Sequence, residues 1–347
     1  MNTFKTTVVF LLLSQAFTAS AQNFNQQPYL QKSFANASIK NVNVKTSGGS
    51  ITITGGNAAD AHVEVYVNPN NNNGETVSKE EITQRMQDYT LDVSMSGSEL
   101  EVSAKPKSSF NLNWKKSLSI SFKIYVPKIA SSNATTSGGS IHLSNLSGNE
   151  NFTTSGGSLT VDELSGNVKG RTSGGSIHVS NSQNNIDLRT SGGGITAENC
   201  NGNIELTTSG GSLKLNNLNG TIHAQTSGGS IHGDHISGEL ITGTSGGSVN
   251  LMDLACSLDA STSAGSINVQ LKELGKYVKI NGSVGHVDLQ LPSGKGLDLN
   301  LHGSRVNANV SGSFDGEKDK TRMVGKLNGG GVPVSISTSV GGINVGN

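Results

Sequence analysis

Residues 208–225, TSGGSLKLNNLNGTIHAQ, are one copy of an 18-residue unit that decides the fold of this chain. Each copy opens with a five-residue tag, TSGGS in most copies, TSGGG in the fourth and TSAGS in the eighth. The tags begin at Thr136, Thr154, Thr172, Thr190, Thr208, Thr226, Thr244 and Thr262. A fixed period of this length is typical of a repeat protein whose units stack on their neighbours.

Hydrophobic alternation divides each unit into two short strands. With the tag threonine as position 1, positions 6 and 8 are mostly apolar and position 7 is polar, as in Leu213-Lys214-Leu215. Position 11 is mostly apolar, position 13 is usually glycine, and positions 15 and 17 alternate again, as in Ile222 and Ala224. Alternation of this kind indicates strands with one buried face. The glycine pair at positions 3 and 4 is expected to turn the chain by adopting positive φ.

One such unit buries too little apolar surface to fold alone, whereas a stack of units forms a continuous core. The predicted fold is all-β, a parallel β-solenoid (β-helix) with 18-residue rungs. Eight rungs at the strand spacing of about 4.8 Å would extend for about 38 Å. A helical repeat is disfavoured because paired glycines and β-branched residues recur in nearly every copy.

Composition and the N-terminus restrict where the chain acts. The formal net charge is zero and only 4% of residues are aromatic, so there is no electrostatic basis for binding nucleic acid. Residues 1–21 have the form of a signal peptide, with Lys5, an apolar run at 8–13 and cleavage after Ala21. The apolar run is too short to span a membrane. We therefore expect export to the periplasm, the cell surface or the medium.

Three regions are expected after the signal peptide. Residues 22–135 hold N-terminal strands, a first tag at Thr46 and a capping insertion. The insertion is expected to form antiparallel strands over or beside the first rungs, with a short helix at 79–89 behind a capping box at Ser78. Strands are expected at 37–44, 51–54, 62–67, 90–95, 99–104 and 117–126.

Residues 136–269 are the regular solenoid repeats, and residues 270–347 are expected to form irregular rungs and a C-terminal cap. In that tail we expect strands at 277–281, 287–291, 297–301 and 306–310, a charged loop at 315–322, and a degenerate last tag at Thr338. The two cysteines, Cys200 and Cys256, lie three rungs apart, about 14 Å at the strand spacing. A disulfide requires Cα atoms within about 7 Å, so both are expected to be unpaired. Cys200 replaces a core leucine and Cys256 replaces a turn glycine, with its role open.

The order of motifs resembles the bacterial putative-adhesin family, a domain of unknown function built from β-strand repeats. The resemblance rests on the first tag at 46–50 with the strand after it, the strand-helix-strand interval, and Val126-Pro127 leading into the tags. It also rests on the segment 326–334, KLNGGGVPV, and the final tag, and covers most of residues 35–347. It implies a surface or envelope protein, and it implies no catalytic residues.

Reactive motifs are present but do not converge. Residues 243–247 match the G-x-S-x-G pattern, yet no strand-to-helix turn is expected there. His142, His178 and His232 share position 7 on separate rungs, too far apart for one zinc site, and His232 and His235 with Asp234 form at best a weak one. Asp187 and Glu205 share position 16 on adjacent rungs and could form a carboxylate pair. The tag threonines resemble the hydroxyl ladders of ice-binding solenoids, but internal hydrogen bonding is the favoured interpretation.

No catalytic, cofactor-binding or metal-ligating residue is assigned from the sequence, and no cofactor is expected. The predicted function is a secreted, non-enzymatic adhesion or scaffold module of the bacterial envelope. Outward positions 7, 9, 14 and 16 would contact a surface glycan or protein through hydrogen bonds. Two alternatives stay open: a polysaccharide-active β-helix hydrolase or lyase, and an envelope assembly or stress factor that binds a protein partner.

Overall fold

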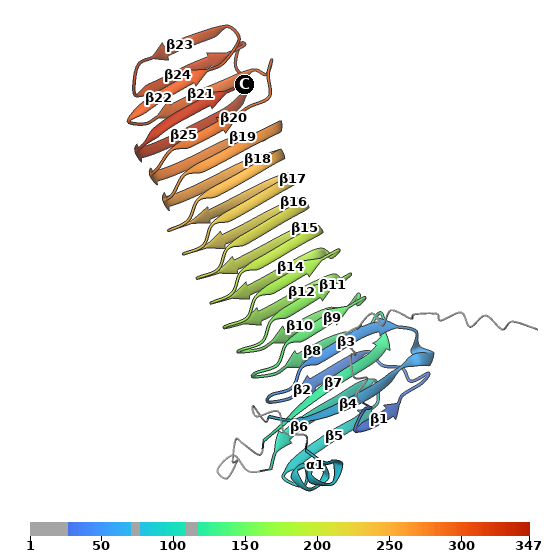
Figure 1. The fold of residues 1–347 in the computed structure, drawn as a ribbon. Helices are drawn as coiled ribbons and strands as arrows, with labels where there is room; N and C mark the ends of the chain where they lie inside the picture. Colours follow the sequence, from blue (N-terminus) through green and yellow to red (C-terminus); the bar gives the residue numbers. More distant parts are fainter. Residues whose placement is uncertain (1–26, 71–76, 108–116) are drawn as a thin grey trace, which may run out of the picture.

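The computed structural model describes residues 27–70, 77–107 and 117–347, and in these ranges the chain is all-β apart from one α-helix and one 3-10 helix (Figure 1). The all-β prediction is confirmed. The predicted signal peptide at residues 1–21 lies outside the described residues. All the described strands belong to one open, hydrogen-bonded sheet system, which Figure 1 shows as an elongated stack.

The N-terminal elements precede the first regular tag. They are β1 (Leu30–Ser33), β2 (Asn41–Lys45), β3 (Ile51–Gly56), η1 (Ala58–Asp60), β4 (His62–Pro69), α1 (Lys79–Met86), β5 (Tyr89–Ser96), β6 (Glu99–Pro106), β7 (Leu118–Pro127) and β8 (Ser131–Thr135). The repeat train follows as β9 (Ile141–Ser144), β10 (Asn149–Thr153), β11 (Leu159–Asp162), β12 (Ser165–Thr172), β13 (Ile177–Ser180), β14 (Gln183–Thr190), β15 (Ile195–Thr208), β16 (Leu213–Thr226), β17 (Ile231–Thr244) and β18 (Val249–Ala264). The C-terminal elements are β19 (Ile267–Val284), β20 (Val287–Gln290), β21 (Leu297–His302), β22 (Arg305–Asn309), β23 (Phe314–Lys318), β24 (Arg322–Leu327), β25 (Val332–Val340) and β26 (Gly342–Gly346).

Within the strands of the repeat train, residues pair in parallel with the residues 18 positions away. Ile177 of β13 lies beside Ile195 of β15, and Ile195 lies beside Leu213 of β16. Side chains at positions 6, 8, 11, 15 and 17 are buried in nearly every unit, as the alternation predicts. Large and small residues interlock along these columns: a Cβ added to Gly170 would lie 2.4 Å from a ring carbon of Phe152 in the rung before it. The aliphatic columns therefore form one continuous core.

The tag forms the first corner of each rung and is held by buried threonines. The Thr208 hydroxyl donates to the Gly193 carbonyl of the previous rung at 2.8 Å and accepts from the Gly211 N–H at 3.3 Å. Equivalent bonds to the preceding carbonyl recur at the tag threonines of the train, for example at Thr154 and Thr226. The predicted internal hydroxyl ladder is confirmed.

The expected reason for the glycine pair is wrong. None of the glycines at positions 3 and 4 of the eight regular tags has positive φ. Position 4 instead requires glycine because the rungs approach closely: a Cβ on Gly211 would lie 2.0 Å from the Gly193 carbonyl oxygen. Position 3 has more room, with 3.5 Å to the nearest atom at Gly210, and the eighth tag places Ala264 there.

The second corner is built by a left-handed residue at position 10 and a glycine at position 13. Position 10 has φ between 50° and 55° in seven successive units, at Asn145, Glu163, Asn181, Asn199, Asn217, His235 and Asp253. Asparagine is among the few non-glycine residues that adopt this conformation readily. At position 13, Gly202 and Gly220 have φ of 120° and 124°, so the conformational role of glycine belongs to this corner.

Both ends of the stack have a rung order that departs from chain order. Near the N-terminus, β2 lies between β6 and β8, and β3 lies between β7 and β9, all in parallel. Near the C-terminus, β25 lies between β19 and β21, and β26 lies between β20 and β22. The rung of the first tag (β2 and β3) and the rung of the last tag (β25 and β26) therefore each lie between two other rungs. The strands outside them, β6 and β7 at one end and β21 and β22 at the other, come from residues between these two tags in the chain.

This order corrects the expectation for the N-terminal insertion. Antiparallel pairing is present between β1 and β4, β4 and β7, and β5 and β6. β6 and β7 lie beside the first tagged rung, which is one of the two expected placements, but they pair with β2 and β3 in parallel and so continue the stack as an extra rung. At the other end, β24 pairs antiparallel with β21, and the charged strand β23 pairs antiparallel with β24 and closes the stack.

Three local predictions also change. The helix begins as predicted, with the Glu81 N–H donating to the Ser78 hydroxyl, but it ends at Met86 because Tyr89 starts β5 opposite Pro106. The strand expected at 37–44 starts only at Asn41. The charged loop expected at 315–322 is largely the β23–β24 hairpin, whose charged side chains lie on an exposed edge strand. Both cysteines are free, as predicted, and both are buried, which was expected only of Cys200.

Candidate functional site

Two outward faces run along the stack, one carrying positions 7 and 9 and the other positions 14 and 16. We call them the 7/9 face and the 14/16 face. On both faces, polar side chains hydrogen-bond to their equivalents one rung away. The Asn185 amide donates to Asn167 at 2.9 Å and Asn167 donates to Asn149 at 2.7 Å. These asparagines stabilise the stack as well as lining it, because an amide has two donor hydrogens and can still face solvent with one.

The 7/9 face ends in a groove at its C-terminal part, which we call the amide groove. Its wall residues come from the successive strands β18, β19, β20, β26 and β22. They are Met252, Asn268, Val269, Gln270, Asp288, Leu289, Gln290, Asn307, Asn309, Asn344, Val345 and Gly346. A cluster of this many side-chain amides was not singled out from the sequence, because the order of the last rungs brings residues 288–290, 344–346 and 307–309 together.

Hydrogen bonds fix one side of the amide groove. The Asn344 amide donates to Asp288 at 2.6 Å, and the Asn307 amide donates to Asn344 at 3.1 Å. On the other side, Gly346 leaves a notch in the column that contains Gln290 and Asn309, where a Cβ would lie 2.8 Å from the Gln290 Oε1. Met252 adds an apolar side chain that is 47% exposed. The groove thus offers fixed donors and acceptors beside one apolar surface.

The predicted carboxylate pair lies in a second groove, on the 14/16 face. Asp187 and Glu205 are register partners, and the groove also contains Lys169. The Arg189 guanidinium lies between the carboxylates, 2.8 Å from Asp187 Oδ1 and 2.6 Å from Glu205 Oε1. The hydrogen bond to Asp187 is the main cause that raises the pKa of Arg189. Arg189, a permanent cation, therefore binds both carboxylates. The groove nevertheless brings two carboxylates and a lysine together, which is a combination that a polysaccharide-active enzyme could use.

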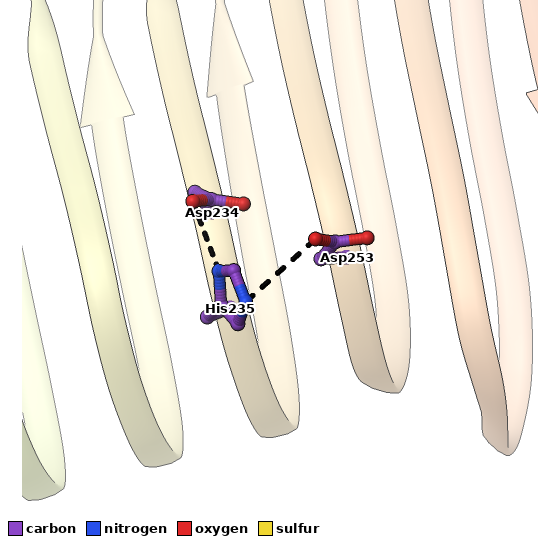
Figure 2. A group of neighbouring side chains, drawn as sticks. All are labelled: Asp234, His235 and Asp253. Atoms are coloured by element: carbon purple, nitrogen blue, oxygen red, sulfur yellow. Dashed lines mark ion pairs between the residues drawn. The ribbon is translucent and has the colours of Figure 1, made fainter.

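A third cluster lies at the second corner of two adjacent rungs and contains Asp234, His235 and Asp253 (Figure 2). His235 Nδ1 is 2.9 Å from Asp234 Oδ2, and His235 Nε2 is 3.7 Å from Asp253 Oδ2. The sequence indicated Asp234 and His235 as part of a weak metal site, but it did not indicate Asp253. The signal was available, since residues 235 and 253 occupy position 10 of adjacent units. His232 contributes nothing to this group, and Thr160 stands between His142 and His178 in the register.

A buried glutamate in the core was also missed. Glu150 occupies position 15 of the first regular unit, where most units hold an aliphatic residue, and is 1% exposed. One carboxylate oxygen accepts from the Ser132 hydroxyl, and the other has no partner. Burial raises the pKa of Glu150 from 4.5 to about 7. The signal was the acidic side chain at an inward position of the repeat.

The G-x-S-x-G stretch at 243–247 leaves β17 and leads into β18, another strand, so it lacks the helix of a nucleophile elbow. Within the described residues, no helix has the length and apolar character needed to cross a membrane.

Comparisons with known proteins give a family match over part of the chain. Residues 239–346 match the family model described as Toastrack DUF4097, which confirms the predicted resemblance over these residues. Comparison with curated proteins finds no match.

Two solved structures are similar at low identity. A "putative cell adhesion protein" from Clostridium sporogenes is 14% identical, with 92% of this chain and 99% of that chain covered and a TM-score of 0.21. A "putative adhesin" from Bacteroides fragilis is also 14% identical, with the same coverage and a TM-score of 0.23.

Proposed function

We propose that this chain is a non-enzymatic adhesion module, exported to the bacterial envelope or beyond, that binds a neutral surface glycan in the amide groove. The stack of 18-residue parallel rungs acts as its rigid support. The observation that carries the proposal is the convergence of amides from Asn268, Gln270, Gln290, Asn307 and Asn309 in one groove. The predicted signal peptide supports export.

The chemistry of the groove suits sugar hydroxyls. Side-chain amides donate and accept at once, as vicinal hydroxyls do, and repeat along the stack at about the 4.8 Å strand spacing. Met252 can pack against the apolar face of a sugar ring. The groove has one carboxylate, Asp288, and no cation among its lining residues, which favours a neutral ligand. Because the rungs hold these groups in place, little conformational entropy is lost on binding.

Substitutions that fill the amide groove, or that remove its side-chain amides, are expected to weaken glycan binding. The variants are Gly346→Leu, which fills the notch, and the double variant Gln290→Ala/Asn309→Ala, which removes amides. Each should weaken binding to an immobilised panel of neutral polysaccharides at least about tenfold, since hydrogen bonds to fixed groups are lost. The measurement is the dissociation constant of each chain on the panel by surface plasmon resonance.

The matched control is Asn203→Ala, an outward amide in the groove on the 14/16 face, which should bind like the wild type. Equal binding by the groove variants and the wild type would contradict the proposal, as would failure of the wild type to bind any member of the panel. Urea midpoints of all chains establish that the comparison is between folded proteins.

A second candidate is a polysaccharide-active enzyme, favoured by the groove that holds Lys169, Asp187 and Glu205. If the carboxylates were the catalytic pair of a hydrolase, or one were the base of a lyase, Asp187→Asn would abolish turnover. We expect neither reducing ends nor unsaturated sugars to be released by the wild type, because Arg189 occupies both carboxylates. Release by the wild type that Asp187→Asn loses would establish the enzyme instead.

A further inference from the structure

The corner cluster of Asp234, His235 and Asp253 departs from what the fold requires. Four of the five preceding units hold asparagine at this left-handed position. There the amides form a ladder: Asn217 donates to Asn199 at 2.9 Å, and Asn199 donates to Asn181 at 3.3 Å. In the next two units the ladder is replaced by His235 and Asp253, with φ of 53° and 55°. Histidine and aspartate also adopt this conformation, but neither side chain continues the amide ladder.

The replacement brings three metal-ligating side chains together. Each can offer one ligand atom, and these atoms all lie within 4.8 Å of one another. Figure 2 shows the imidazole between the two carboxylates, with one ring nitrogen directed at each. Around a tetrahedral ion with bonds of about 2.0–2.1 Å, ligand atoms are roughly 3.3 Å apart. Because one imidazole nitrogen binds one ion, the carboxylate that contacts the other nitrogen must rotate toward the ion, and the half-buried aspartates and the exposed histidine of this corner leave room for that rotation.

The donor set restricts the ion. One imidazole nitrogen and two carboxylate oxygens suit zinc, which commonly takes three protein ligands and keeps a further position for water or ligand. Calcium prefers six to eight oxygen ligands, which this corner does not offer. A competing cation is already present: Lys272 Nζ lies 3.1 Å from Asp253 Oδ2, so a metal ion would take over the charge compensation that the ammonium provides.

We propose that Asp234, His235 and Asp253 form a zinc-type divalent metal site with an open coordination position. The site lies at the end of the amide groove, because Asp234 is the register partner of the groove residue Met252. The open position can therefore be filled by an oxygen of a molecule bound in the groove. Metal binding itself is independent of the proposed glycan function and is measured without any glycan.

The test is calorimetric titration of zinc chloride into the full exported chain after removal of metals with a chelator. We expect one saturable site per chain, lost or weakened at least about tenfold in His235→Asn and in Asp253→Asn, since each variant removes one of three ligands. Asparagine occupies the same position at the second corner of most preceding units, so both variants should keep the urea midpoint of the wild type. His232→Asn, an exposed histidine on the same rung, is the matched control and should bind zinc like the wild type.

Absence of a stoichiometric zinc site in the wild type would overturn the proposal, and so would unchanged affinity in His235→Asn. Saturable calcium binding with no zinc binding would overturn the assignment of the ion. A glycan titration with and without zinc then addresses the open position separately. Glycan binding with the same affinity in the presence and absence of zinc would leave the proposed adhesion function intact. Zinc binding without any glycan binding would contradict only the adhesion function.

Discussion

Gly211→Ala is expected to destabilise the stack by about 3 kcal/mol or more, because overpacking at a site with no room commonly costs 1–3 kcal/mol and more where backbone must move. The added Cβ would lie 2.0 Å from the Gly193 carbonyl oxygen and 2.3 Å from its carbon. Both atoms are backbone atoms of the previous rung, so the rungs must separate locally. That separation also lengthens the bond between the Thr208 hydroxyl and the same carbonyl.

Gly210→Ala is the matched control, one residue away in the same tag. Its Cβ would be 3.5 Å from the nearest atoms, an ordinary contact, and the eighth tag already holds Ala264 at this position. We expect its free energy of unfolding to stay within about 0.5 kcal/mol of the wild type, as for most uncrowded surface substitutions. Urea denaturation followed by circular dichroism measures both variants. Equal destabilisation by the two alanines would contradict close rung approach as the reason for glycine at position 4.

Stability is expected to fall as pH rises from 5 to 8, because Glu150 is buried beside only one hydrogen-bond donor side chain. Burial raises its folded-state pKa from 4.5 to about 7. A carboxyl group with a raised pKa binds its proton more tightly in the folded chain. Its contribution is therefore fully present below pH 4.5 and is lost as pH rises to about 7. The difference in pKa corresponds to roughly 3 kcal/mol.

Glu150→Gln isolates this effect, since glutamine keeps the shape and can still accept from the Ser132 hydroxyl. We expect the variant to be roughly 3 kcal/mol more stable than the wild type at pH 8 and to lose most of the difference at pH 5. The measurement is the free energy of unfolding by urea at four values between pH 5 and pH 8. Parallel pH profiles for the two chains would show that the carboxyl is not the source of the dependence.

The regular rungs could be predicted from the sequence because their signal is repeated. Eight tags in register make the burial of a residue such as Leu213 almost independent of its individual neighbours. The strand after each tag and the hydroxyl ladder at Thr208 follow from the same repetition. A single glycine pair, in contrast, does not reveal whether it serves positive φ or close approach. That distinction needs the position of the previous rung, here of the Gly193 carbonyl.

Features that occur once were harder to predict. The order of the terminal rungs depends on pairings such as β20 with β26, between residues 56 apart in the chain. Consequently the amide groove, which joins Asp288 and Asn344, could not be seen along the sequence. The hairpin at β23 was hidden because charged residues are typical of loops and also protect edge strands. Glu150 and the pairing of His235 with Asp253 were visible in the register, and recognising them required comparing each unit with its neighbours position by position.

The insertion of β25 and β26 between earlier strands has a mechanical consequence. A pull on the C-terminal end acts on strands that are hydrogen-bonded along both edges, to β19 and β21 and to β20 and β22. Pulling β25 or β26 out of the sheet breaks the backbone hydrogen bonds along both of its edges at once. An outermost strand is hydrogen-bonded along one edge only and separates more easily. Tension applied at this end would therefore reach the regular rungs of the stack before the terminal strands separate.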